Sequence, residues 1–183
     1  MGLAVLASGS GTLLEAILAA GLQPLIVVSD RPCRALEIAA GAGVPARLVR
    51  RRDFGPAFDR ATYTDEVVRV LKDAGTGLVA MAGFMTVLGP QAFSAFPERI
   101  LNTHPSLLPA FPGAHAVRDA LAFGVKVTGC TVHVATETVD HGPILAQEAV
   151  PVLAGDDEAT LHERIKAVER RLYPEIIAEV AGA

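Results

Sequence analysis

An apolar run, a glycine-rich turn and a second apolar run open the chain, and this order constrains its fold more than any other feature. Gly2–Ala7 has the continuous hydrophobicity of a buried strand, and Leu13–Ala20 has helical periodicity. Further strands are predicted at 24–29, 46–49 and 77–82, and further helices at 33–42 and 61–74. Such alternation produces a parallel sheet. The sequence therefore predicts an α/β fold with a Rossmann-like open, mostly parallel, twisted sheet and helices on both faces.

The second half of the chain departs from this alternation. Strands are predicted at 126–136 and 144–152, and the turn residues between them at 138–143 indicate an antiparallel hairpin at one edge of the sheet. Within 126–136, apolar residues alternate with threonines and His133, so we expect one face of this strand to be wetter than the other. A long helix follows, with an apolar stripe that includes Leu161, Ile165 and Leu172.

Composition limits the classes of function. With 183 residues, 51% of them hydrophobic, residues 1–183 are expected to form a single globular domain. The net charge of −4 argues against nucleic acid as a partner, and the basic run Arg50–Arg52 is interpreted as a solvated connector. The spacing of Cys33 and Cys130 suggests neither a disulfide nor a zinc site, and no apolar run is long enough to span a membrane. We therefore expect a cytoplasmic location.

The glycine-rich turn Ser8–Thr12 is a candidate phosphate site. It joins a strand to a helix, so backbone N–H groups and the positive end of the helix can face an anion, with hydroxyl groups as further donors. The pattern has no P-loop lysine and no third glycine of a dinucleotide fingerprint. A plain tight turn between strand and helix stays open.

The most informative polar pair is Asn102 and His104. In a strand, positions i and i+2 point to the same face, and Pro105 ends the strand just beyond them. Open α/β sheets bind ligands at the carboxyl ends of their strands, so this pair is a candidate active site. The alternative is a buried pair that only satisfies backbone groups.

A second candidate binding segment is Gly83–Pro90, which follows the strand at 77–82. It is expected to be an exposed but apolar loop that could accept a flat aromatic ligand. A hydrophobic staple leading into a helix is the alternative, and spacing does not decide between them.

Several motifs taken together resemble the folate-dependent formyltransferases. They are Ser8–Thr12, Ala82–Met85, the string Asn102-Thr103-His104-Pro105-Ser106-Leu107-Leu108-Pro109, Phe111–Gly113, Asp140-His141-Gly142-Pro143-Ile144 and Glu169–Pro174. The resemblance covers essentially the whole chain and is strongest to the members that act in purine synthesis. It implies transfer of a formyl group from 10-formyltetrahydrofolate, the co-substrate, to the glycine amine of glycinamide ribonucleotide.

The resemblance also implies roles for individual residues. Asn102, His104 and Asp140 match the catalytic trio. The ribonucleotide positions are Gly11, Thr12, Leu13, Lys166 and Glu169, and the folate positions are Arg60, Met85, Thr86, Val87, Leu88 and Asn102. The chain departs from the family pattern twice, since asparagine is common where Leu13 stands and arginine is common where Thr86 stands. A homodimer is compatible with the family.

The chemistry of formyl transfer suits these residue types. Attack of a neutral amine on the formyl carbon creates an oxyanion, which an Asn102 N–H and an imidazolium His104 can stabilise. A nearby carboxylate favours the imidazolium, and Asp140 can also accept the proton that the amine sheds. The reaction is expected to need no metal.

Two other functions stay open at this point. One is a nucleotide-binding module without catalysis, and the other is a hydrolase that releases formate from the folate with water as acceptor. Lys166 and Glu169, three residues apart on a predicted helix, could also be a simple surface ion pair.

Overall fold

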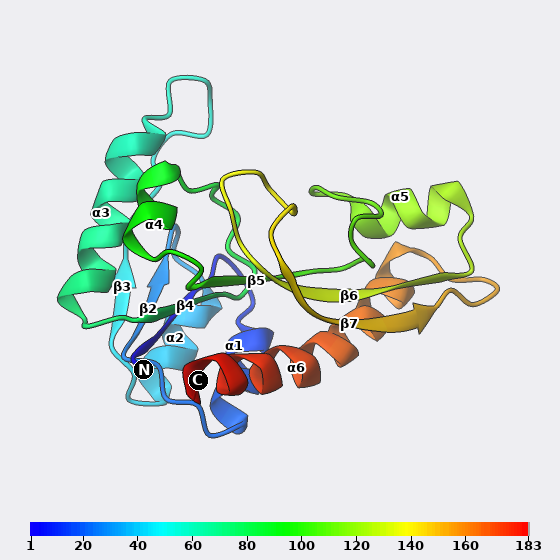
Figure 1. Cartoon of the computed structure of the whole chain (residues 1–183), viewed down its shortest axis with the longest axis horizontal. Coiled ribbons are helices and arrows are strands. Elements are labelled where there is room, and N and C mark those ends of the chain that lie inside the picture. The colour runs from blue at the N-terminus through cyan, green and yellow to red at the C-terminus, as the bar shows by residue number, and fades with distance from the viewer. Residues whose placement is uncertain (183) are drawn as a thin grey trace.

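A single twisted sheet organises the chain in the computed structural model, which describes residues 1–182 (Figure 1). Within these residues it has seven strands in the order β3-β2-β1-β4-β5-β6-β7. Their bounds are β1 Leu3–Leu6, β2 Ile26–Ser29, β3 Ala46–Leu48, β4 Leu78–Met81, β5 Ile100–His104, β6 Val127–Val134 and β7 Ile144–Pro151. Strands β1 to β5 pair in parallel, and β6 is antiparallel to both β5 and β7. The predicted parallel sheet with an antiparallel hairpin at its edge is confirmed.

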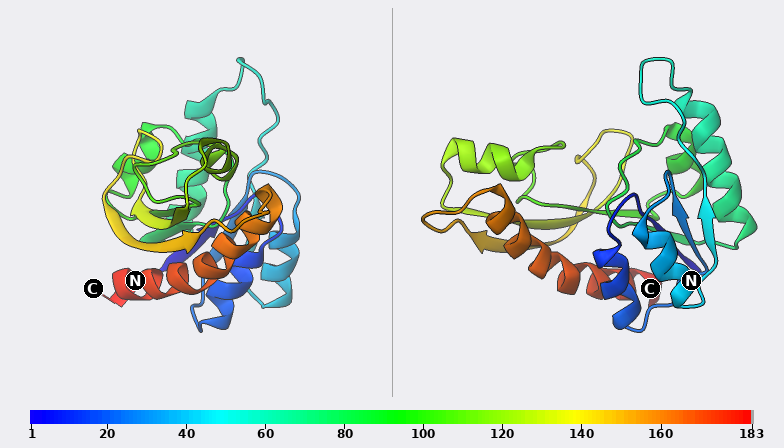
Figure 2. Two further views of the ribbon diagram at one scale, coloured as in Figure 1. Left: turned by 90° about the vertical axis from the view of Figure 1, so that its right-hand side faces the viewer. Right: turned by 180° about the vertical axis from the view of Figure 1, so that it is seen from behind.

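Helices cover both faces of the sheet, as the views in Figures 1 and 2 show. They are α1 Thr12–Ala19, α2 Arg34–Gly41, α3 Arg60–Asp73, α4 Pro90–Ala95, α5 Ala116–Phe123 and α6 Glu158–Gly182. Helices α1, α2 and α6 lie on one face, while α3 and α4 lie on the other. The short helix α4 is not predicted from sequence, since six residues are too few for a clear helical period.

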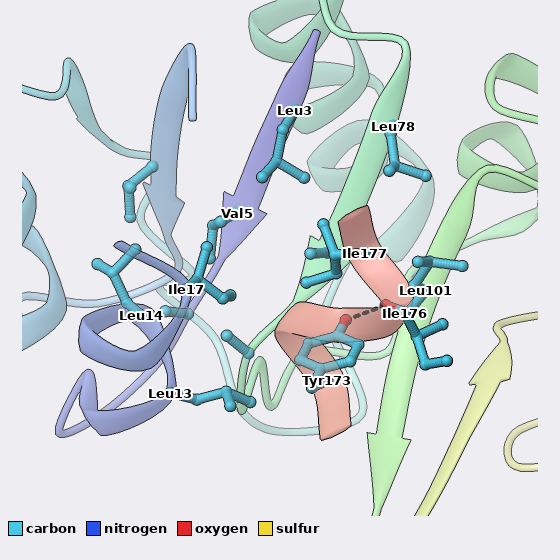
Figure 3. Packing of buried hydrophobic residues seen from close by; sticks show 14 of the residues in the cluster. Leu3, Val5, Leu13, Leu14, Ile17, Leu78, Leu101, Tyr173, Ile176 and Ile177 are labelled. Carbon is cyan, nitrogen blue, oxygen red and sulfur yellow. Dashed lines mark hydrogen bonds between the residues drawn. The ribbon is translucent and has the colours of Figure 1, made fainter. Parts of the chain in front are cut away.

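Two of the three apolar cores among the described residues hold the sheet between these helix layers. In β1, Leu3 and Val5 pack toward α1 and α6, whereas Ala4 and Leu6 pack toward α3 and α4. Strand β1 is therefore buried on both faces, as expected for a central parallel strand. Figure 3 shows the first core, where the hydroxyl group of Tyr173 in α6 donates to the backbone carbonyl of Leu101 in β5 at 2.8 Å. This bond satisfies a buried hydroxyl and places α6 beneath β5.

One prediction about the hairpin is wrong. Strand β6 does not have a wetter face, because every residue from Thr128 to Val134 is buried and only Val127 is exposed. Cys130, Val132 and Val134 face α6, whereas Thr131 and His133 point to the opposite face of the strand. The hydroxyl group of Thr131, for example, donates to the carbonyl of Ser106 and accepts from the N–H of Leu108. Hydrogen bonding to this loop replaces the solvent that the alternation suggested.

Candidate active site

A cleft opens at the carboxyl ends of β4 and β5, where the sheet changes from parallel to antiparallel pairing. It encloses about 550 Å³ of space, counting the part open to solvent. Its wall is largely apolar, with an amide, an imidazole and a carboxylate among its few polar groups. The lining residues are Met81, Phe84, Met85, Thr86, Val87, Leu88, Phe93, Asn102, His133, Ala135, Thr136, Val139 and Asp140. This composition is typical of a small-molecule site.

Asn102 and His133 face each other across the β5–β6 pair. The two residues are register partners, and the Asn102 amide nitrogen lies 3.3 Å from His133 Nε2. His133 Nδ1 lies 3.0 Å from the carbonyl oxygen of Val134, which can only accept, so Nδ1 carries the proton. In the neutral ring Nε2 is then an acceptor for the Asn102 N–H. His133 thereby fixes the orientation of the Asn102 amide.

Burial supports the neutral state of His133. Desolvation lowers its pKa, and His104 acts in the same direction, against the carbonyl of Val134 and the carboxylate of Asp140. Because the pKa is lower in the folded chain, the unfolded chain binds more protons, so the free energy of unfolding falls as the pH drops below about 6.5.

We therefore expect His133→Gln to lose less stability than wild type between about pH 7.5 and about pH 5.5, because glutamine does not titrate there. Urea unfolding at the two pH values measures the difference. His115→Gln, at an exposed histidine, is the matched control, and His162, whose pKa burial also lowers, is unchanged in both variants. Equal losses in the two variants would contradict this account.

His104 and Asp140 form the second pair of the site. His104 Nδ1 lies 3.4 Å from Asp140 Oδ2, and both side chains are about 5% exposed. Asp140 Oδ1 lies 3.7 Å from His133 Nε2, so the carboxylate touches both imidazoles. His104 Nε2 donates to the carbonyl oxygen of Phe111 at 2.8 Å. An acceptor oxygen thus lies near each ring nitrogen of His104.

The backbone at Asp140 is unusual. Its φ is 60°, in the left-handed region, and its Oδ2 accepts a hydrogen bond from the N–H of Gly113 at 2.8 Å. A non-glycine residue in this region costs free energy and is held there by its surroundings. The carboxylate is thus aimed at His104 by the chain conformation as well as by its partner.

The glycine-rich turn ends at Gly11, the N-cap residue of α1. Gly11 has φ 75°, and a Cβ atom there would lie 2.6 Å from Ile38 Cδ1 and 3.0 Å from Ala35 Cα. Both the conformation and the close approach of α2 therefore require glycine. Leu13 is buried in the core, so only its backbone N–H can face a ligand, beside the half-buried Thr12 at the start of α1.

The loop 83–88 is not uniformly exposed, which corrects the expectation from sequence. Met85 and Val87 are exposed, whereas Phe84, Thr86 and Leu88 are buried. The Thr86 hydroxyl group donates to the carboxylate of Asp30 at 2.7 Å. The loop is also tied to the glycine-rich turn, since the Met85 N–H donates to Ser8 Oγ at 2.9 Å.

Arg60 lies apart from the cleft wall. It is the exposed first residue of α3, and its carbonyl accepts from Thr64 Oγ1, which in turn accepts from the N–H of Gly89. The side chain therefore starts near the loop that lines the cleft, although the structure does not bring it into the lining.

Lys166 and Glu169 lie on α6, against the other face of β5. No salt bridge joins Lys166 to Glu169 among residues 1–182, so the alternative prediction of a surface ion pair between them is wrong. Burial raises the pKa of Glu169, against the opposing effects of Thr103, Lys166 and Arg170. Thr103 points to the face of β5 opposite Asn102 and His104, because side chains alternate along a strand.

Asp30 and Arg31 lie near the cleft, and the sequence analysis does not single them out. They follow β2 directly, at the same carboxyl edge of the sheet as the cleft. An acid and a base at the end of a predicted parallel strand are the signal that could have found them. Among the described residues, no group of three or more His, Cys, Asp and Glu side chains is placed to hold a metal ion.

Comparisons with known proteins agree with this geometry. Residues 1–177 match the family described as formyl transferase. The chain belongs to this family. It is 54% identical to a phosphoribosylglycinamide formyltransferase of Mycobacterium tuberculosis, with 98% of this chain and 84% of that protein covered.

Solved structures agree as well. A glycinamide ribonucleotide transformylase of Symbiobacterium toebii superposes with a TM-score of 0.89 at 46% identity, over 96% of this chain and 84% of that one. A phosphoribosylglycinamide formyltransferase of Streptococcus pneumoniae superposes with a TM-score of 0.90 at 37% identity, over 98% of both chains. The formyltransferase fold predicted from the motifs is thereby confirmed.

Proposed function

We propose that the chain transfers the formyl group of 10-formyltetrahydrofolate to the glycine amine of glycinamide ribonucleotide. The products are formylglycinamide ribonucleotide and tetrahydrofolate, in the de novo synthesis of purines. One observation carries this function: in a formyl transferase chain, Asn102, His104 and Asp140 converge beside an apolar cleft. The cleft accepts the flat pterin of the donor, and the three polar groups face its formyl end.

The two substrates approach from opposite faces of the sheet. The folate positions Met85–Leu88 and Asn102 lie on the side of α3 and α4, with Arg60 at the start of α3. The ribonucleotide positions Gly11–Leu13, Lys166 and Glu169 lie on the side of α1 and α6. The phosphate then binds the N–H groups at the start of α1, as the helix dipole favours. The amine and the formyl carbon meet at the end of β5.

The site stabilises the tetrahedral intermediate through two donors. The amine nitrogen attacks the formyl carbon, a C–N bond forms, and the carbonyl oxygen takes the negative charge. One N–H of Asn102 is held by His133, which leaves the other to donate to this oxyanion. The N–H at His104 Nε2 is the second donor, with the oxyanion as acceptor in place of the Phe111 carbonyl.

Proton transfer completes the reaction. The attacking amine becomes positively charged and loses a proton to Asp140 or to a water that Asp140 holds. His104 delivers a proton to N10 of the folate, the C–N10 bond breaks, and tetrahydrofolate leaves. Asp140 stabilises the imidazolium form of His104 until that step.

An absorbance assay tests the function directly. The chain is mixed with the formyl donor, with and without glycinamide ribonucleotide, and tetrahydrofolate and formate are measured. We expect tetrahydrofolate only when the ribonucleotide is present. Formate release without it would indicate the hydrolase, and phosphate binding with no turnover would indicate the binding module.

The phosphate position makes a separate prediction. Gly11→Ala is expected to raise the KM for the ribonucleotide by about tenfold or more and to change the KM for the folate little, since Cβ displaces the amides that face the phosphate. It should also cost about 1 kcal/mol or more of stability.

Gly43→Ala is the matched control, because Gly43 also has positive φ but has nothing within 4 Å of its Cβ position. It should lose similar stability from its backbone and leave both KM values unchanged. Equal rises in the two KM values for Gly11→Ala would place the phosphate elsewhere.

Three further expectations stay predictions: a homodimer, a cytoplasmic location and a reaction without metal. None of the helices in residues 1–182 is both long and apolar enough to cross a membrane.

A further inference from the structure

Helix α6 and strand β5 are held in a fixed register. The hydroxyl group of Tyr173 donates to the carbonyl oxygen of Leu101 at 2.8 Å (Figure 3). Glu169 lies one helical turn before Tyr173, a distance of about 6 Å along the helix axis. Thr103 lies two residues beyond Leu101 on the same face of β5, a distance of about 6.6 Å along the strand. Because the two spacings nearly agree, the bond of Tyr173 places Glu169 over Thr103.

The hydroxyl group of Thr103 is hydrogen-bonded to the Glu169 carboxylate. Burial raises the pKa of Glu169, and the hydrogen bond from Thr103 is the largest of the effects that oppose this rise. A hydrogen bond that lowers the pKa of a carboxyl group stabilises its charged form. Thr103 is therefore the donor, and the Glu169 carboxylate is the acceptor.

The thiol of Cys130 in β6 fixes the direction of this hydrogen bond. Cys130 Sγ lies 3.3 Å from Thr103 Oγ1. Burial raises the pKa of Cys130 to about 12, so the thiol keeps its proton. A threonine hydroxyl has a single hydrogen, and Thr103 gives it to Glu169, so the thiol donates to Thr103 Oγ1. Two hydrogen bonds thus run in series from Cys130 through Thr103 to Glu169.

The Glu169 carboxylate can accept further hydrogen bonds from a ligand. Its side chain is half-buried, and the guanidinium of Arg170, the next residue, pairs with Glu163 at 2.6 Å. No salt bridge involves Glu169 among residues 1–182. An ionised carboxylate has about four acceptor positions, so the bond from Thr103 leaves others unoccupied.

We propose that Thr103 is a positioning residue for ribonucleotide binding, which acts by turning the Glu169 carboxylate toward the N–H and O–H donors of the substrate. This inference rests on the proposed function, in which Glu169 is a ribonucleotide position. Thr103 directly precedes His104, and its side chain points to the ribonucleotide side of β5. The alternative is a structural role, in which the hydroxyl group only satisfies buried polar groups.

Thr103→Val tests the proposal, because valine keeps the branched shape of the side chain and lacks the hydroxyl group. Isothermal titration calorimetry measures the Kd of glycinamide ribonucleotide and, separately, that of tetrahydrofolate. We expect Thr103→Val to raise the Kd of the ribonucleotide by about fivefold and that of tetrahydrofolate by less than about twofold. Thr103→Ser keeps the hydroxyl group, so both of its Kd values should stay within about twofold of wild type.

Thr128→Val is the matched control. Thr128 lies on β6 and is buried, and its hydroxyl group has no hydrogen-bond partner in the part of the chain that the structure describes. Its loss should leave both Kd values unchanged. Glu169→Ala removes the carboxylate that Thr103 positions, so adding Thr103→Val to Glu169→Ala should raise the Kd of the ribonucleotide by less than about twofold.

The outcomes separate this proposal from the reaction itself. If the wild-type chain binds the ribonucleotide and Thr103→Val binds it equally well, the role of Thr103 is overturned and formyl transfer is untouched. An equal loss in Thr103→Ser, in tetrahydrofolate binding or in the Glu169→Ala background would also overturn it. Because calorimetry needs no turnover, the selective loss would support Thr103 even if formyl transfer were not found. A wild-type chain that binds no ribonucleotide would overturn both.

Discussion

Replacing Asp140 by asparagine is expected to lower kcat by about two orders of magnitude or more near neutral pH, with the fold and the binding of both substrates nearly unchanged. The loss arises because the carboxylate has two proposed tasks. It stabilises the imidazolium of His104, and it accepts the proton of the attacking amine.

Asparagine is a suitable probe for structural reasons specific to this site. It tolerates positive φ as well as aspartate does, so the backbone at φ 60° can be kept. Its side-chain oxygen can still accept from the N–H of Gly113. Charge is then the main property that changes.

Stopped-flow single-turnover rates at saturating substrates measure the loss, with Asp73→Asn on the exposed face of α3 as the control. An Asp140→Asn rate equal to that of wild type would show that Asp140 is only a turn residue.

Local pattern was sufficient to predict the sheet and much of the site. Continuous apolar runs identify buried strands, and Asn102 and His104 lie on one face because strand side chains alternate. The motif Asp140-His141-Gly142-Pro143 lies far from them in sequence, yet the resemblance placed it in the same site. The structure then brought Asp140 to 3.4 Å from His104.

The features that were missed depend on contacts between distant segments. The burial of β6 on both faces follows from the loop after β5, whose Leu108 is bonded by Thr131. Thr86 is 56 residues from Asp30, and no periodicity links a threonine in one loop to an acid in another. The burial of Glu169 depends on where α6 crosses β5. Sequence patterns describe single elements, whereas such contacts arise from their packing.

The second large effect is expected at His104. His104→Gln should lower kcat by about 10²-fold or more, because it removes the positive donor for the oxyanion and the proton source for N10. Glutamine fills most of the space of the ring and can still donate to the carbonyl of Phe111. The hydrogen bond between position 104 and the loop after β5 can therefore be retained. The side chain is about 5% exposed, and alanine in its place would leave a cavity.

His141→Gln is the matched control for His104→Gln, since His141 is exposed and next to Asp140 in the chain. Its ring donates only to the carbonyl of Val139, so kcat should stay near that of wild type. Single-turnover rates with saturating substrates isolate the chemical step from binding and product release. A His104→Gln enzyme that keeps the wild-type single-turnover rate and melting temperature would remove His104 from the chemistry and leave Asn102 as the remaining proposed oxyanion donor.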